Sequence, residues 1–178
     1  TMQLNRRWMY FAIVPVIAAA VPGTAWVIGG RDDTTKVEDV RSLYLVADLS
    51  DKRLKMFAAD SLLWPYPISD GTAGYPTPKG SYRIRKLIWN PRWTPPPGSK
   101  WAQKYTPKGP GEPGNPMKVV KIFFREPDYY IHGTAETGRL GDAASHGCIR
   151  MDPEHIAEVA KYIMEHGGQP REESWFWR

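Results

Sequence analysis

Hydrophobic and polar residues alternate with a period of two between residues 43 and 58. Between residues 43 and 49, Leu43, Leu45 and Leu49 share one set of alternate positions, and residues 53–58 repeat the pattern. A period of two is typical of a β-strand with one buried face. Because Ser50-Asp51-Lys52 supplies a turn between the two runs, we predict that they form a hairpin.

Four more runs predict strands: residues 62–69, 81–87, 118–124 and 129–132. Pro65 and Pro67 lie inside the first of these, and proline cannot donate a hydrogen bond to a neighbouring strand. We therefore expect residues 62–69 to lie at the edge of a sheet.

The period changes to that of a helix after residue 152. Asp152 and Pro153 are typical of a helix start, and Gly167 is typical of a helix end. With 17 prolines and 16 glycines in 178 residues, the composition indicates many turns rather than a helical bundle. The sequence thus predicts a mainly β domain with one C-terminal helix.

The N-terminal segment has a different character. Arg6 and Arg7 precede a nearly unbroken apolar run from Trp8 to Ile28, which is as long as the ~20 residues that a helix needs to cross a bilayer. We predict a membrane helix with its N-terminus in the cytoplasm, so that the domain is periplasmic or otherwise outside the inner membrane. A cleaved signal peptide, with its cleavage site near residues 18–20, is the alternative.

The rest of the chain then divides into a polar linker over residues 29–41, a folded domain over residues 42–168 and an aromatic tail over residues 169–178. Within the domain, residues 89–117 are rich in proline and aromatic residues, and we expect them to form a partly ordered lid. The alternative is a spacer whose tryptophans cover the sheet. The net charge of +5 is scattered, which argues against a nucleic-acid partner and suits an anionic cell envelope.

The candidate chemistry centres on Cys148, the chain's only cysteine, which follows His146 and Gly147 directly. A thiolate is a strong nucleophile, and imidazole takes up or gives back a proton near neutral pH. We predict that Cys148 attacks an amide carbonyl while His132 acts as the base, with the Gly133 carbonyl fixing its tautomer. Backbone N–H groups of Gly147 and Cys148 are the predicted oxyanion donors. This chemistry needs no cofactor and no metal.

Several neighbouring residues are candidates for assisting roles. His146 is expected to bind substrate or assist proton transfer. Ser145 and Arg150 are expected to orient the loop or meet a substrate carboxylate, and a structural ion pair is the alternative for Arg150. The full set of candidate substrate-binding residues is Ser145, Arg150, Thr134, Trp93, Trp101 and Tyr105.

These motifs resemble a known family, the L,D-transpeptidase catalytic domain, also called the YkuD domain, from about Leu43 to Gly167. The segments that carry the resemblance are Ile131-His132-Gly133-Thr134, Ser145-His146-Gly147-Cys148-Ile149-Arg150-Met151, Thr77-Pro78-Lys79-Gly80 and Asn115-Pro116-Met117. Lys118 departs from the glycine that the family usually has there, and the chain ends in an aromatic tail where many members have a further strand. The resemblance implies a β-sandwich or barrel of mixed sheets, with one C-terminal α-helix packed on it and a long lid.

The resemblance also implies an activity. Such enzymes form a thioester with a peptidoglycan tetrapeptide stem and release its terminal D-alanine. They pass the acyl group to a stem amine in a 3-3 cross-link, to a lysine of a lipoprotein, to a D-amino acid or to water, and carbapenems acylate the same thiolate.

Three other interpretations stay open at this point. His132, His146 and Cys148 could form a zinc site with an open position. The domain could also be a non-catalytic module that binds peptidoglycan, or a cysteine protease that acts on proteins.

Overall fold

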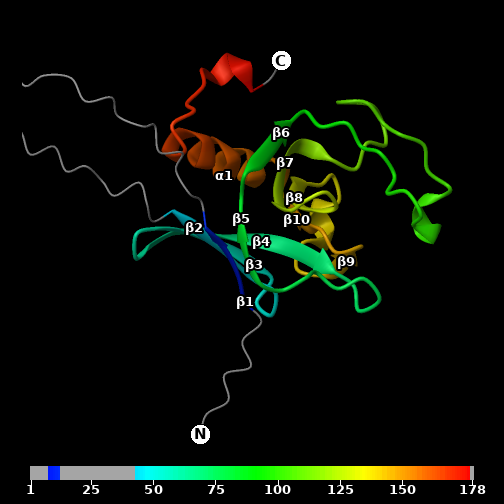
Figure 1. Ribbon diagram of the computed structural model, residues 1–178, viewed down its shortest axis with the longest axis horizontal. Coiled ribbons are helices and arrows are strands. Elements are labelled where there is room, and N and C mark those ends of the chain that lie inside the picture. Colours follow the sequence, from blue (N-terminus) through cyan, green and yellow to red (C-terminus); the bar gives the residue numbers. More distant parts are fainter. Residues whose placement is uncertain (1–7, 13–42, 177–178) are drawn as a thin grey trace, which may run out of the picture.

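The computed structural model describes residues 8–12 and 43–176 of the chain (Figure 1). Most of its strands belong to one mixed sheet with the order β5-β1-β2-β3-β4-β10-β8-β7-β6, and β9 pairs with β4 beside this path. The bounds are β1 Trp8–Ala12, β2 Tyr44–Asp48, β3 Arg53–Ala58, β4 Ser61–Gly71, β5 Ser81–Arg83, β6 Lys86–Trp89, β7 Lys118–Arg125, β8 Tyr129–Gly133, β9 Ala143–Ser145 and β10 Ile149–Met151.

The sheet is curled. Strands β5 and β6 stand at opposite ends of the strand order, yet only residues 84 and 85 separate them along the chain. Because Arg83 and Lys86 are only three residues apart, they lie within about 10 Å of each other, and the two ends of the sheet come close together, as they do in a barrel. The pairs β1–β5, β8–β10 and β4–β9 are parallel and the others antiparallel, which confirms the predicted mixed, mainly β architecture.

The predicted hairpin is confirmed by antiparallel β2 and β3, with Leu45 opposite Met56. The prediction that the next strand lies at a sheet edge is wrong, since β4 lies between β3 and β10. Pro65 and Pro67 pair only with β3, whereas β10 begins to pair with β4 at Ile68. The prolines are tolerated because their part of β4 has one strand partner, and the missing N–H groups interrupt no second ladder.

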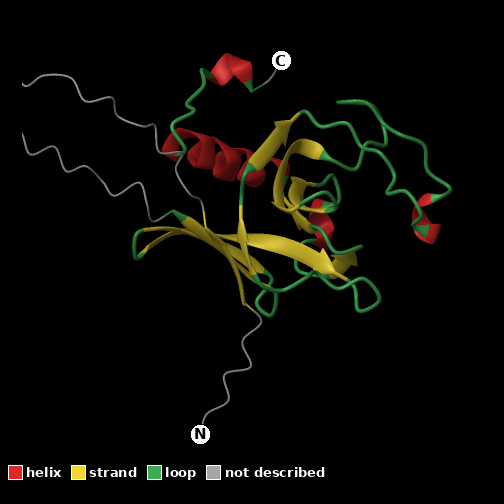
Figure 2. Ribbon diagram, in the orientation of Figure 1, coloured by secondary structure: helices red, strands yellow, loops and turns green. Residues whose placement is uncertain are grey.

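The predicted helix is α1, Pro153–His166, the one α-helix of the described residues. The Asp152 side chain accepts a hydrogen bond of 2.8 Å from the Glu154 N–H and caps the first turn. The helix buries Ile156, Val159 and Ile163 against β7 and β8, where they join the main core. Figure 2 shows α1 beside β6 and β7, with the long β6–β7 loop extending away from the helix.

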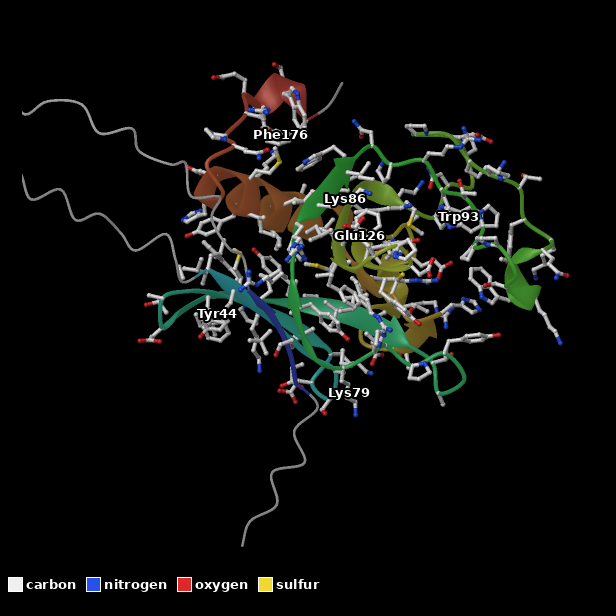
Figure 3. The ribbon with its side chains drawn as sticks, in the orientation of Figure 1. Tyr44, Lys79, Lys86, Trp93, Glu126 and Phe176 are labelled. Atoms are coloured by element: carbon white, nitrogen blue, oxygen red, sulfur yellow. The ribbon has the colours of Figure 1, made fainter. Side chains whose placement is uncertain are left out.

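The aromatic tail packs on the domain as far as it is described. A short 3-10 helix, Glu173–Trp175, leads to Phe176, whose ring lies 4.6 Å from that of Trp89 in β6. Phe176 is buried, close to α1 (Figure 3), and Lys161 of α1 pairs with Glu173 at 2.6 Å. The tail thus packs against β6 and α1.

The N-terminal segment differs from its prediction. Residues 8–12 form β1, which pairs with β2 on one side and with β5 on the other. The expected continuous membrane helix from Trp8 to Ile28 is therefore wrong over residues 8–12, because the open edges of β2 and β5 offer these residues main-chain hydrogen bonds. The remainder, residues 13–28, and the predicted linker 29–41 lie outside the described residues. Among the described residues, no helix is long and apolar enough to span a membrane.

Candidate active site

The two halves of the histidine–cysteine motif meet because β8 and β10 are parallel neighbours. Ile131 pairs with Ile149, His132 with Arg150, and Gly133 with Met151. His132 therefore comes from the end of β8, and Cys148 lies immediately before β10 on the adjacent strand. The sheet thus brings together residues that are 16 positions apart in the sequence.

His132 is held in one orientation. Its ring is buried, and Nδ1 lies 2.9 Å from the carbonyl oxygen of Gly133. The Nδ1 proton donates to this carbonyl, which leaves the Nε2 lone pair free to accept a proton. Burial lowers the pKa of His132 to about 3, assisted by the positive charges of Arg150 and Lys121. The imidazole is thus neutral at physiological pH, as a proton acceptor must be.

Gly133 is required by a close approach between strands. A Cβ atom at this position would lie 2.5 Å from the main-chain oxygen of Lys118 in β7. We expect Gly133→Ala to lower the free energy of unfolding by about 1–3 kcal/mol, because the strands must move apart. Urea denaturation measures this. Gly138→Ala is the matched control, since a Cβ there meets nothing within 4 Å, and an equal loss in both variants would contradict the explanation.

The turn before Cys148 is fixed by Ser145. Its hydroxyl donates to the Cys148 carbonyl oxygen at 2.5 Å and accepts the Gly147 N–H at 3.0 Å. Gly147 has φ +106°, and a Cβ there would lie 2.8 Å from the Tyr129 ring. Ser145 is therefore part of the turn itself. The Gly147 N–H, predicted as an oxyanion donor, is directed at Ser145 instead, because a serine hydroxyl readily bonds the backbone two residues on.

The Cys148 thiol lies between the turn before β8 and an aromatic cluster. Its Sγ donates to the Asp128 carbonyl at 3.4 Å, and the side chain packs against a cluster made of Trp93, Met117, Phe123 and Tyr130. Burial raises the pKa of Cys148 to about 11, although hydrogen bonds from the main-chain N–H and hydroxyl of Tyr130 and the charges of Lys121 and Arg150 act in the opposite direction. At rest the site therefore contains a thiol beside a neutral imidazole.

This raised pKa predicts how the thiol reacts. Only the thiolate is alkylated by iodoacetamide, so we expect the alkylation rate of the folded chain to keep rising with pH through pH 9 and beyond. The measurement reports Cys148 alone, because the chain has one cysteine. The same chain unfolded in urea is the control. Its alkylation rate should level off once the pH exceeds the ordinary pKa of a cysteine thiol, about 8.5. A plateau below pH 9 in the folded chain would contradict the prediction.

His146 faces the lid. It is exposed, and its ring stacks on Trp101 at 3.9 Å and lies 4.6 Å from Tyr75. Trp101 also contacts Tyr105, which in turn contacts the buried Trp93. An open cavity of about 470 Å³ lies here, lined by Lys100, Trp101, Gln103, Lys104, Tyr105 and His146. The lid residues therefore both cover the sheet, through Trp93, and form a wall next to the motif, through Trp101.

Thr134 and Arg150 are engaged within the protein. The Thr134 hydroxyl accepts the N–H of Glu136, and the carboxylate of Glu136 pairs with Arg150 at 2.8 Å. Arg150 thus makes the ion pair that was the alternative to substrate binding. Its Nε is buried, with no hydrogen-bond partner among the described residues.

Two neighbours of Cys148 were not singled out from the sequence, Lys121 and Tyr130. Lys121 is a buried lysine in β7 between Val120 and Ile122, and Tyr130 is a buried tyrosine in β8. A lysine inside an otherwise apolar strand was an available signal, because lysine is rarely buried without a partner.

The zinc alternative requires three ligands around one point. No group of three or more His, Cys, Asp or Glu side chains in the described part of the chain is arranged to hold a metal ion. His146 stacks on the lid, while His132 is bound to the Gly133 carbonyl.

Comparison with known proteins decides the family. The profile of the L,D-transpeptidase catalytic domain matches residues 42–167. The chain belongs to the L,D-transpeptidase catalytic domain family. A protein of Fuscovulum blasticum named as an L,D-transpeptidase is 37% identical over 122 residues, which are 65% of this chain and 61% of that protein. The L,D-transpeptidase YkuD of Bacillus licheniformis is 26% identical over 119 residues, 67% of this chain and 59% of that protein. The chain thus matches about six tenths of the length of these relatives.

One solved L,D-transpeptidase supports the same fold. The L,D-transpeptidase LdtMt1, solved in complex with imipenem, aligns with a TM-score of 0.50 at 16% identity, over 66% of this chain and 61% of that one. An L,D-transpeptidase from Mycobacterium smegmatis gives a TM-score of 0.48 at 16% identity, with the same coverage of both chains.

Proposed function

We propose that this chain is a cysteine L,D-transpeptidase that acts on peptidoglycan stem peptides. The observation that carries the proposal is the pairing of β8 with β10, which sets a neutral, tethered His132 on the strand next to Cys148. A non-catalytic binding module has no need for a histidine held as a proton acceptor beside the chain's only thiol. Membership of the family supplies the substrate class.

In the first half-reaction, the Cys148 sulfur attacks the carbonyl carbon of the third residue of a tetrapeptide stem, and its proton passes to Nε2 of His132. A carbon–sulfur bond forms and the carbonyl electrons move to oxygen, which accepts a hydrogen bond from the Cys148 N–H. When this intermediate collapses, the carbon–nitrogen bond breaks. His132 returns its proton to the departing D-alanine amine, leaving a thioester.

In the second half-reaction, an acceptor amine attacks the thioester carbonyl and gives up a proton to His132. A carbon–nitrogen bond forms, the carbon–sulfur bond breaks, and His132 passes the proton to the departing sulfur, which restores the thiol. The acceptor is a neighbouring stem in a 3-3 cross-link, a protein lysine or a D-amino acid, and water gives carboxypeptidase activity instead. The cavity beside His146, with Trp101 and Tyr105 as one wall, is the proposed place for the substrate's peptide chain. Since peptidoglycan lies outside the cytoplasmic membrane, the proposed function places the domain there.

The decisive experiment incubates the 178-residue chain with purified disaccharide tetrapeptide and follows the products by mass spectrometry. We expect an acyl adduct on Cys148, free D-alanine and a cross-linked dimer. Adding a free D-amino acid or a lysine peptide distinguishes the acceptors by product mass. A folded, reduced chain that binds the tetrapeptide but forms no adduct and releases no D-alanine would overturn the proposal in favour of the binding module. Cleavage of L,L-peptides instead would favour the protease.

A further inference from the structure

Lys121 is buried in the middle of β7, with 8% of its surface exposed. Its Nζ donates to the main-chain oxygen of Arg92 at 3.1 Å and lies 4.7 Å from the centre of the Tyr130 ring. An ammonium group removed from water is costly unless it meets an opposite charge. Among the described residues, no carboxylate lies within ion-pair distance of this Nζ.

The strand register places this lysine in the active site. Lys121 pairs with His132 across β7 and β8, and His132 pairs with Arg150 across β8 and β10. Residues directly opposite one another project from the same face of a sheet. Lys121, His132 and Arg150 therefore form a row, in which a positive charge stands on each side of the neutral histidine.

Tyr130 connects Lys121 to the reactive sulfur. It lies two residues before His132 on β8, so both side chains share a face of the strand, and the two rings are 5.7 Å apart. Phe123 packs edge-on against the Tyr130 ring at 5.3 Å and holds its plane. Cys148 packs against the same aromatic cluster. The ring thus has the lysine cation over it and the sulfur beside it.

We propose that Tyr130 and Lys121 stabilise the negative charge that develops on the Cys148 sulfur as it attacks. This inference rests on the proposed function. Tyr130 acts as a catalytic residue whose hydroxyl donates to the thiolate. Lys121 is a positioning residue. Its cation holds the Tyr130 ring by a cation–π contact and strengthens the Tyr130 hydroxyl as a hydrogen-bond donor. The thiolate in turn provides the negative charge that the buried Lys121 ammonium otherwise lacks.

The remaining charged and titratable groups around the sulfur make such support necessary. His132 on β8 and the Cys148 thiol are both uncharged at rest. Burial of each group disfavours its charged form, and therefore disfavours a thiolate–imidazolium pair. Arg150 on β10 favours the thiolate but is already paired with Glu136. Burial raises the pKa of Tyr130, with a smaller contribution from the negative charge of Asp128 before β8, and so keeps its hydroxyl protonated as a donor. His146 faces the lid.

The test measures alkylation of Cys148 by iodoacetamide from pH 6 to 11 in Lys121→Met, Tyr130→Phe and the double variant. We expect each single variant to react about tenfold more slowly at pH 8, which corresponds to a thiol pKa about one unit higher. We expect the double variant to lose less than the product of the two effects, since both act on the same charge. Pseudo-first-order rates come from intact mass spectra.

Lys86→Met is the matched control. Lys86 also places its Nζ over an aromatic ring of the same cluster, 5.0 Å from Phe123, but it is exposed and pairs with Glu126 (Figure 3). Its removal should leave the pH profile of alkylation unchanged. Thermal melting separates charge from structure: Lys121→Met should melt no lower than the parent chain, because a methionine of similar length removes a poorly compensated buried charge.

The outcomes distinguish this inference from the proposed function. An unchanged alkylation profile in Lys121→Met and Tyr130→Phe, with tetrapeptide turnover intact in the parent chain, would overturn the inference alone. A slower, shifted profile supports the inference even if the parent chain transfers no acyl group, because alkylation requires no peptidoglycan. A shift of equal size in Lys86→Met would also overturn it.

Discussion

We expect replacement of Cys148 with alanine to abolish release of D-alanine from the disaccharide tetrapeptide. Cys148 is the chain's only cysteine, and it lies immediately before β10, the strand that pairs with the one carrying the tethered His132. Without it no thioester forms, and the expected loss of turnover is at least about 10⁴-fold, as for loss of the nucleophile in other acyl-transfer enzymes. D-alanine release, measured by a coupled oxidase assay, gives the rate.

The same variant has a second readout. A carbapenem such as imipenem carries a strained lactam that should acylate Cys148, so the parent chain gains the mass of the drug and Cys148→Ala does not. Because the half-buried thiol is small, the variant should fold and bind tetrapeptide as the parent chain does. Residual turnover above background, or an adduct on another residue of the variant, would contradict the assignment of the nucleophile.

The parts of the fold that the sequence predicted are those with local signals. The hairpin of β2 and β3 follows from alternation and a three-residue turn, and α1 follows from Asp152, Pro153 and the spacing of its apolar residues. The errors concern long-range pairing. Nothing in the local pattern of residues 61–71 shows that this strand passes from β3 to β10, and an apolar run cannot reveal that residues 8–12 fill a gap between β2 and β5.

In the candidate site, too, the residues with local signals could be predicted from the sequence, and those that depend on long-range pairing could not. Cys148 and His132 stand in a motif whose spacing could be read directly, and the Nδ1 contact of His132 with the Gly133 carbonyl involves adjacent residues. The direction of the Gly147 N–H depends on the rotamer of Ser145, which a sequence does not reveal. Lys121 reaches the site only through the β7–β8 register, and a bulge between Lys118 and Lys121 sets that register. Partners of this kind require the folded sheet.

The two histidines of the motif should behave differently when each is replaced with alanine. His132 is buried, neutral and tethered, and general acid–base catalysis by one such group contributes about 10²–10⁴-fold. We expect His132→Ala to lose acyl transfer by about that factor. His146 is exposed and stacks on Trp101, so His146→Ala should keep about a tenth of the activity, as a substrate-contact residue would, and its loss should appear mainly in KM.

Steady-state rates of D-alanine release for both variants test this difference, and their pH dependence sharpens it. With the pKa of His132 lowered to about 3, protonation of the base begins to matter only as the pH falls toward that value. The parent chain should therefore lose no activity through His132 between pH 7 and pH 5. Burial and the charge of Arg150 lower the pKa of His146. An acid limb between pH 7 and pH 5 that disappears in His146→Ala would instead identify His146 as the group that exchanges the proton. Equal losses in kcat for the two variants would also identify His146 as a proton-transfer group. A residue that only forms the wall of the substrate cavity is expected to change KM rather than kcat.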